Sequence, residues 1–332
     1  MEKITIEKLA EKLNLSKSTV SRAFRDSFDI NPKTKQKILD AAKQLDFQPN
    51  TIAKSLREKI TKRIGIIIPS FTIPFYAKAI CGIQEIASYE GYNLLICQSN
   101  ESYKTEIQNI KSLLNSCVDG IIMSVTKETS QYNHITQLRN KNIPIVLFNR
   151  TTDIDHISKV RVDDYGATYK MTEYLVSKGY QNIIYIAGPK NLKMTINRIK
   201  GFKDAMYVKK IKLSPYSIIH GDFSIESGLK CTGEILKNIR PDAIFCSCDN
   251  VAYGVIKYLK KLGIRIPEDI AVAGYTDEPF ASLIEPALTT IRQPIYEIGQ
   301  TAAQLLFKQL KYSNAKPEIC ILPTELIIRS ST

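Results

Sequence analysis

The sequence has little that would serve a disulfide-bonded or metal-binding protein. Its seven cysteines are an odd, scattered set without a C-x-x-C pair, which disfavours both a disulfide framework and a zinc site. Its three histidines lie far apart along the chain, without the spacing of metal ligands. We therefore expect buried thiols and no bound metal.

Targeting and membrane segments are also missing. The start MEKITIEKLAEKLNL lacks the apolar core of a signal peptide, and a run of about 18 apolar residues occurs nowhere. We therefore expect a cytoplasmic protein with no membrane partner.

Motifs that cradle phosphate or activate a nucleophile are absent as well. No G-x-G-x-x-G follows a strand-like run, and neither G-x-x-x-x-G-K-[ST] nor G-x-S-x-G occurs. An enzyme remains a rival interpretation in principle, because parallel α/β sheets host many dehydrogenases and hydrolases. Without these motifs we expect no catalytic residues and no cofactor.

Positive charge is concentrated at the N-terminus. The chain carries a net charge of +13, and residues 1–63 hold 15 Lys and Arg against 8 Asp and Glu, a net +7. Such a region attracts polyphosphate, because each Lys or Arg that neutralises a phosphate releases a condensed counterion. Nucleic acid is the expected partner, although an anionic membrane surface would attract the same charge.

Three short helices are predicted over residues 1–47. Apolar residues recur at helical spacing in ITIEKLAEKL, and the NLS that follows supplies a turn and an N-cap. A second helix should run from about residue 17 to 24. Asn31-Pro32 then marks a third start, an N-cap followed by proline at the first helical position.

The first two of these helices fit a helix-turn-helix. Ala10 is small enough for close helix approach, and Val20 is spaced to pack beneath it. If Val20 and Ala23 face inward, the other face of the second helix presents donors to base edges and phosphates. Those donors are Lys17, Ser18, Ser21 and Arg22, with Arg22 the expected guanine reader. An ordinary helical hairpin with a solvated basic face is the alternative.

Beyond the helices, the chain changes character twice. Residues 48–62, QPNTIAKSLREKITK, carry a proline and too few large apolar residues to bury a stable helix alone, so this linker could fold on contact. From Arg63 onward, strand-like runs alternate with amphipathic helical stretches, which predicts parallel sheets covered on both faces. The runs are RIGIIIP, NLLIC, DGIIMS, PIVLF, NIIYIA, YSIIH, DAIFC and IAVAG. A weak segment near 151–159 separates them into two sets of four, which predicts two similar lobes.

Several of these segments resemble one family. LNLSKSTVSRAF and QPNTIAKSLR are similar to the DNA-binding head and hinge of the lactose-repressor (LacI/GalR) family, and CSCDNVAYGVIKYLKKLGIRIPEDIAVAGY and EPALTTIRQPIYEIGQTAAQLL extend the likeness over essentially the whole chain. The resemblance implies an all-α helix-turn-helix head (1–47), a hinge (48–62) and a two-lobed, periplasmic-binding-protein-like α/β domain with parallel sheets (63–332) that binds an effector and dimerises.

The resemblance also implies how the chain divides between the lobes. It implies three crossings, near Arg161, Ile291 and Pro323. The N-lobe would then be about 63–160 plus 292–322, and the C-lobe about 161–291 plus 323–332.

For the head and hinge, the resemblance implies a set of DNA contacts. Lys17, Ser18 and Arg22 match positions that touch bases, and the positions that hold the DNA backbone are Thr5, Ser16, Thr19, Ser21 and Asn31. Leu56 matches an apolar wedge that kinks the minor groove, with packing on its dyad mate as the alternative. The surrounding hinge contacts match Asn50, Ala53 and Arg57.

For the cleft between the lobes, the resemblance implies an effector pocket. The matching positions are Ser70, Phe75, Tyr76, Asn149, Asp163, Arg198 and Phe223. Arg198 is physically the strongest, because a guanidinium offers paired donors to an anionic or polyhydroxyl ligand. Its alternative role is a salt bridge between the lobes with Asp249 or Asp277, and for Phe75 and Phe223 the alternative is packing in the cleft wall.

Three departures from the family's pattern bear on the ligand. The family often has Asp where this chain has Asn149, an amide where it has Cys248 just before Asp249, and Asp where it has Thr276. Asp277 is a possible substitute for the last, one residue displaced. Because specificity depends on a few polar groups, the effector should not be copied from a lactose or purine relative.

Together these observations predict a sequence-specific DNA-binding transcriptional regulator. We expect a homodimeric repressor of a carbohydrate-utilisation operon that binds a pseudo-palindromic operator and is controlled by a small sugar or metabolite in the cleft. The alternative is a DNA-binding regulator controlled by a protein corepressor on the outer face of the first lobe. A transport binding protein would share the lobes but not the DNA-binding head.

Overall fold

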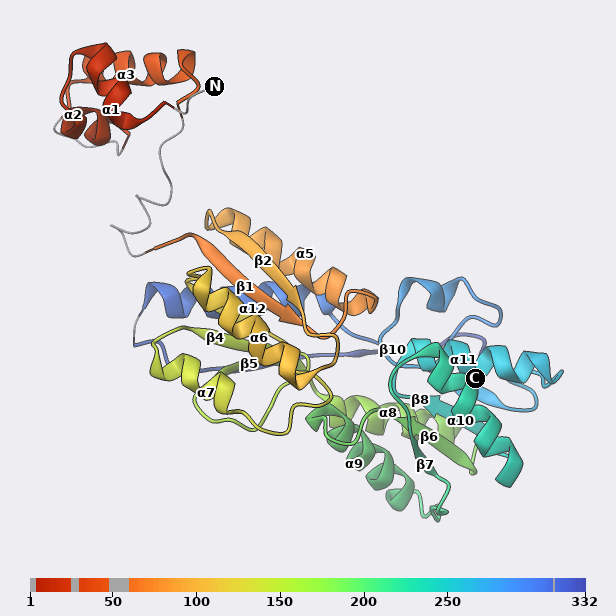
Figure 1. Ribbon diagram of the computed structural model, residues 1–332. Coiled ribbons are helices and arrows are strands. Elements are labelled where there is room, and N and C mark those ends of the chain that lie inside the picture. The colour runs from red at the N-terminus through yellow and green to blue at the C-terminus, as the bar shows by residue number, and fades with distance from the viewer. Residues whose placement is uncertain (1–3, 25–29, 48–59, 313) are drawn as a thin grey trace. The chain divides into compact units, whose positions relative to one another are not determined.

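The computed structural model describes residues 4–24, 30–47, 60–312 and 314–332 (Figure 1). The chain divides into two compact units, Met1–Thr61 and Lys62–Thr332. The predicted hinge residues Asn50, Ala53, Leu56 and Arg57 lie outside the described residues.

The first unit contains the three predicted helices. They are α1 (Ile6–Leu13), α2 (Lys17–Ala23) and α3 (Pro32–Gln44). Each helix contributes one fully buried residue to a single apolar cluster: Leu9, Val20 and Ile38. Each helix thus buries one apolar stripe in a small shared core, as the helical spacing predicted.

In the second unit, the larger sheet has six parallel strands in the order β11-β5-β4-β3-β1-β2. We call the part built on it the N-lobe. Its strands are β1 (Arg63–Ile68), β2 (Asn93–Gln98), β3 (Gly120–Met123), β4 (Ile145–Phe148), β5 (Ser158–Val162) and β11 (Ile319–Leu322). Its helices are α5 (Pro74–Tyr89), α6 (Tyr103–Asn115), α7 (Asn133–Asn140) and α12 (Ile295–Lys311).

Helices cover both faces of this sheet because its strands are apolar on both sides. Ile64, Ile66 and Ile68 of β1 pack with α5 and α12, whereas Ile67 packs with α6 and α7 on the opposite face. This alternation follows from the two-residue repeat of a strand. The carboxyl ends of the strands are left for the loops that build a site.

The smaller sheet has four parallel strands in the order β7-β6-β8-β9, and we call the part built on it the C-lobe. Its strands are β6 (Ile183–Ala187), β7 (Ile218–His220), β8 (Ala243–Cys246) and β9 (Ala271–Ala273). Its helices are α8 (Asp164–Ser177), α9 (Lys193–Val208), α10 (Ile225–Asn238), α11 (Asp249–Lys261) and the 3-10 turn η1 (Pro279–Ser282). One apolar cluster joins the sheet to α8 and α9, and another joins it to α10 and α11.

The chain passes between the lobes at three places. It leaves the N-lobe sheet after β5, returns along β10 (Thr290–Arg292) into α12, and passes from β11 into β12 (Glu325–Ile327). β10 and β12 pair as an antiparallel ribbon of their own. The lobes are therefore joined by three separate segments of the chain rather than by one linker.

The eight predicted strands are all present. The expectation of four strands in each lobe is wrong for the N-lobe, whose sheet has six strands because β5 and β11 join it. β5 begins inside the weak segment and carries Lys159 and Arg161, so it lacks an apolar run. β11 lies at the edge of the sheet, where Ile319 and Ile321 stay exposed. β5 is buried but its charged residues interrupt the apolar pattern, whereas β11 is only partly buried, so both strands have little sequence signal.

Candidate functional site

The N-cap residues of the first unit bind their own helix ends. Thr5, Ser16 and Asn31 cap α1, α2 and α3, and each side chain accepts a hydrogen bond from a backbone N–H of the first turn. The Ser16 Oγ also lies 2.8 Å from the hydroxyls of Ser18 and Thr19. These contacts fix the first turn of α2, whose amide dipoles favour a nearby anion.

One face of α2 is polar and accessible. Val20 and Ala23 are buried, as predicted, while Lys17, Ser18 and Arg22 are exposed. Lys17 forms an ion pair with Glu7 of α1, which lowers the pKa of that carboxyl to about 2. The Arg22 Nε donates to the Ser18 carbonyl. This face, with the half-buried Thr19 and Ser21 at its edge, has the size and chemistry to enter a major groove.

A pocket of about 460 Å³, part of it open to solvent, lies between the N-lobe and the C-lobe. Its N-lobe wall consists of Ile73, Phe75, Tyr76, Asn149 and Arg150. Its C-lobe wall consists of Met194, Arg198, Phe223, Ser247, Cys248, Asn250, Thr276 and Glu278, and Gln293 follows the crossing strand β10. Mostly apolar walls with a few polar groups are typical of small-ligand sites.

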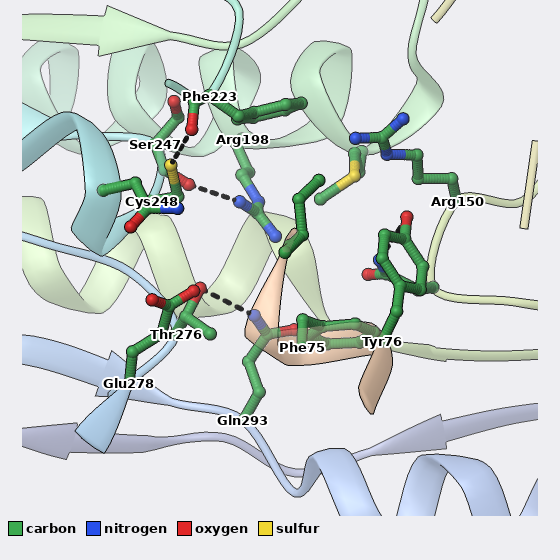
Figure 2. A pocket seen from close by; sticks show the side chains of 14 residues that line it. Phe75, Tyr76, Arg150, Arg198, Phe223, Ser247, Cys248, Thr276, Glu278 and Gln293 are labelled. Atoms are coloured by element: carbon green, nitrogen blue, oxygen red, sulfur yellow. Dashed lines mark hydrogen bonds between the residues drawn. The ribbon is translucent and has the colours of Figure 1, made fainter. Parts of the chain in front are cut away.

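Arg198 occupies the middle of this pocket (Figure 2). Its Nε donates to Asp164 Oδ1 and its Nη1 to the Ser247 carbonyl, both at 2.8 Å. The guanidinium lies 3.5 Å from the centre of the Tyr275 ring. Burial raises the pKa of Asp164 despite this pairing. The predicted alternative for Arg198 is wrong in its partners, because neither Asp249 nor Asp277 bonds to it.

Three lining residues keep a buried polar atom without a hydrogen-bond partner. They are the Nη2 of Arg198, the hydroxyl of Ser247 and the Oε1 of Gln293. Buried polar atoms are nearly always paired, so a cluster of unpaired ones needs an explanation. A polar ligand between the lobes would supply one.

Arg150 is the second guanidinium on the pocket wall. Its Nη1 bonds to both carboxylate oxygens of Glu101, at 2.8 and 2.9 Å, and it lies 5.3 Å from the Phe223 ring centre. Gly188 allows the Phe223 ring to reach this place, because a Cβ there would lie 2.3 Å from the ring. The Phe223 ring thus lies near both the Arg150 guanidinium and the Gly188 backbone.

The carboxyl on the pocket wall is Glu278, not Asp277. Asp277 does not line the pocket because Arg292 and Arg329 hold its carboxylate, each at 2.7 Å. Glu278 is buried, and its backbone N–H donates to Asp249 Oδ2 at 2.7 Å. Burial, reinforced by Asp249, raises the pKa of Glu278 to about 7. Burial likewise raises the pKa of Asp249 to about 6.

Strained backbone is concentrated at the same site. Asn149, Phe223 and Thr276 line the pocket with φ angles of 58°, 72° and 135°. Positive φ is costly for non-glycine residues and most of all for a β-branched one such as Thr276. Such strain persists where the surroundings enforce it, as at ligand sites.

The structure brings together most of the predicted effector residues. Those on the pocket wall are Phe75, Tyr76, Asn149, Arg198, Phe223, Cys248 and Thr276. The others have partners elsewhere: Ser70 contacts Thr72, Asp163 caps α8, Asp249 is buried behind the wall, and Asp277 forms the ion pairs above. Burial raises the pKa of the Cys248 thiol to about 12, so it faces the pocket in its neutral form.

Sequence reasoning missed seven lining residues, namely Ile73, Arg150, Met194, Ser247, Asn250, Glu278 and Gln293. Ser247 directly follows β8 and Arg150 is the second residue after β4, positions that could have suggested them. Glu278 had no such signal, since its direction depends on the two preceding residues with positive φ.

The described residues contain neither a metal-binding cluster nor a membrane-spanning helix. In these parts of the chain, no cluster of three or more His, Cys, Asp or Glu could hold a metal ion. No described helix is both long and apolar enough to cross a membrane.

Two family models together cover most of the chain. One, described as bacterial regulatory proteins of the lacI family, matches residues 5–50, and the other, described as periplasmic binding proteins and sugar binding domain of LacI family, matches residues 61–330. This chain belongs to the LacI family of bacterial transcription regulators. The helix-turn-helix and the two-lobed α/β fold predicted from the sequence are confirmed.

Relatives within the LacI family are similar over nearly their whole length. Catabolite control protein A of Priestia megaterium is 30% identical over 333 residues, which is 99% of each chain. The ribose operon repressor of Halalkalibacterium halodurans is 31% identical over 99% of this chain and 97% of the relative. These relatives are regulators and not enzymes, in agreement with the sequence prediction.

Solved LacI-family structures show the same fold. A lac repressor dimer bound to operator and the anti-inducer ONPF matches with a TM-score of 0.90 and 25% identity, over 100% of this chain and 99% of the other. A LacI-family regulator from Enterococcus faecium with bound ribose matches with a TM-score of 0.73 and 29% identity, over 81% of this chain and 98% of the other.

Proposed function

We propose that this LacI-family regulator is a repressor of a carbohydrate-utilisation operon, controlled by a small sugar or sugar derivative in the pocket between its lobes. The observation that carries the proposal is the set of unpartnered buried polar atoms on Arg198, Ser247 and Gln293, three residues that line that pocket. A ligand with several hydroxyls would pair them. The ribose bound to the Enterococcus faecium neighbour supports this class of ligand.

In this proposal the head reads DNA through α2. Lys17, Ser18 and Arg22 contact bases in the major groove, and the DNA backbone is held by Thr5, Ser16, Thr19, Ser21 and Asn31. The hinge places Leu56 in the minor groove, with Asn50, Ala53 and Arg57 around it. The operator-bound lac repressor dimer supports a pseudo-palindromic operator and a homodimer.

Control of DNA binding would come from the angle between the lobes. Arg198 belongs to the C-lobe, whereas Tyr76 and Asn149 belong to the N-lobe, so a ligand that bonds both walls favours one lobe arrangement. The hinge joins the N-lobe at its first strand, β1. A ligand can shift such an equilibrium only by its differential affinity for the two arrangements, typically about 1–3 kcal/mol.

The test combines operator selection with ligand screening. The purified chain selects binding sites from a random DNA pool, and we expect a pseudo-palindromic consensus. Thermal unfolding is then measured with sugars, sugar acids, sugar phosphates and nucleobases, because a ligand at 100 times its Kd stabilises by about 2.7 kcal/mol. We expect a sugar to raise the Tm and to change operator affinity about 5- to 150-fold.

Arg198→Lys connects this response to the pocket. It keeps a positive charge beside Asp164 but removes the Nη2 donor, so the sugar response should disappear while operator binding stays. Lys200→Ala, on the exposed side of the same helix, is the matched control. If a folded, DNA-binding protein responds to no small molecule, the sugar proposal is wrong and a protein corepressor takes its place.

A further inference from the structure

The acceptor side of the pocket decides which sugars fit it. Besides the donor on Arg198, the pocket presents the unpartnered Oε1 of Gln293 and the carboxyl of Glu278. Both of these groups accept hydrogen bonds. A ligand that fills the pocket must therefore donate hydrogen bonds as well as receive one.

The two guanidinium groups do not make the pocket positive. Arg150 is paired with Glu101, and Arg198 is paired with Asp164. Glu278 forms no ion pair among the described residues. Its carboxyl is therefore the charge on the pocket wall that no neighbour neutralises.

The conformation of the loop that carries Glu278 determines the direction of its side chain. Thr276 and Asp277 both have positive φ, which turns the chain sharply just before Glu278. Asp249 accepts the Glu278 N–H and the Thr290 hydroxyl, while Gly274 gives the Asp249 carboxylate room, since a Cβ there would lie 2.3 Å from its Oδ1. Figure 2 shows Glu278 beside Thr276, on the opposite side of Arg198 from Tyr76 and Arg150.

We propose that Glu278 is a specificity-determining residue, whose carboxylate accepts hydrogen bonds from the hydroxyls of a neutral polyhydroxyl ligand and disfavours a sugar acid or sugar phosphate. This inference rests on the proposed sugar-binding function and specifies which class of sugar the pocket binds. Thr276 stands where the resemblance leads one to expect Asp, so Glu278 supplies the missing carboxylate from two residues further along the chain. Its position changes which ligand hydroxyls the carboxylate can reach.

The protonation of Glu278 should then be coupled to binding. The titratable groups that interact with its charge are Asp249 and Tyr253 of α11 and Cys248, the N-cap of α11, whereas Asp277 of its own loop is paired with Arg292 and Arg329. Hydroxyl donors stabilise the ionised carboxylate and lower its pKa, so a neutral sugar releases a proton on binding. An anionic ligand would raise that pKa and take up a proton instead.

Isothermal titration of the full chain with matched pairs tests the proposal. Each pair is a neutral sugar and its charged counterpart: D-ribose with ribose 5-phosphate, D-glucose with gluconate, and cellobiose with cellobionate. We expect a neutral sugar to bind at least about tenfold more tightly than its counterpart, since a hydrogen bond to a charged group is a strong one. Its affinity should rise about tenfold from pH 6 to pH 8, because the pKa of free Glu278 is about 7.

Glu278→Gln should weaken neutral-sugar binding about tenfold at pH 8 and remove the pH dependence, whereas the exposed Glu268→Gln should change neither. Tighter binding of the anionic counterpart, or an unchanged affinity and pH profile in Glu278→Gln, would overturn the role of Glu278 while leaving a sugar-controlled repressor in place. Binding by no member of any pair would overturn both proposals.

Discussion

The two walls of the pocket present buried polar groups in different ways. On the N-lobe wall, among the described residues, no buried side-chain nitrogen or oxygen is left without a partner. The C-lobe wall and the crossing strand leave three such atoms, on Arg198, Ser247 and Gln293, and also carry the unpaired Glu278. The N-lobe wall thus satisfies its own buried polar groups, whereas the C-lobe wall leaves groups that the proposed ligand would pair.

The largest expected difference between the walls concerns their ion pairs. Arg198 and Asp164 are both 3% exposed, whereas Glu101, the partner of Arg150, is 20% exposed. Asp164→Ala leaves Arg198 charged in a dry site, which should lower the free energy of unfolding by about 3–5 kcal/mol. Glu101→Ala lets water reach Arg150 and should lower it by about half as much.

Urea unfolding of the two variants measures this difference. Asp153→Ala, which breaks an exposed ion pair with Lys193, is the control and should have little effect. Equal losses for Asp164→Ala and Glu101→Ala would mean that the two walls hold their guanidinium groups equally well.

A second, smaller effect concerns pH. The pKa of Glu278 is raised to about 7 from an ordinary 4.5, so the folded chain binds this proton more tightly than the unfolded chain. Stability from this group is therefore present at low pH and is lost as pH rises from about 4.5 to 7. Glu278→Gln should remove about 2 kcal/mol of that loss between pH 5 and pH 8.

The measurement is the free energy of unfolding against pH, without ligand, for the parent chain, Glu278→Gln and Glu268→Gln. Glu268→Gln should follow the parent. If Glu278→Gln follows it too, burial does not raise the pKa of Glu278 as expected.

The smallest effect is expected on the N-lobe wall. The Tyr76 hydroxyl lies 3.1 Å from the Ser124 hydroxyl and accepts from the Asn149 amide at 3.4 Å. Tyr76→Phe should lower the free energy of unfolding by about 1 kcal/mol, the value of a modest hydrogen bond. Calorimetry of a bound sugar should show a smaller loss of affinity than Glu278→Gln; a larger loss would move specificity to the N-lobe wall.

The sequence predicted the parts of this molecule that depend on local patterns. Helical spacing located Leu9, Val20 and Ile38, and apolar runs located eight strands, most of them buried. It did not locate β5 or β11, whose charged or exposed residues interrupt the apolar pattern. β5 is buried but carries charged residues, and β11 is partly exposed, so neither has the continuous apolar run that short-range patterns detect.

In the pocket, too, local sequence patterns predict some residues and not others. Arg198, Phe223 and Tyr76, which the resemblance named, line the pocket, and they sit after strands or in the first two turns of helices. The resemblance favoured Asp277 over Glu278, because the direction of these side chains depends on backbone angles and ion pairs far apart in the chain. No local pattern encodes those contacts.

The three passages of the chain between the lobes bear on the order in which the protein folds during synthesis. The four strands of the C-lobe sheet lie between residues 183 and 273, whereas the N-lobe sheet needs β11, residues 319–322, and the helix α12 before it. A ribosome extends the chain at about 5–20 residues per second. The sheet that begins first is thus completed last, and for several seconds its edge beside β5 stays open until β11 is synthesised.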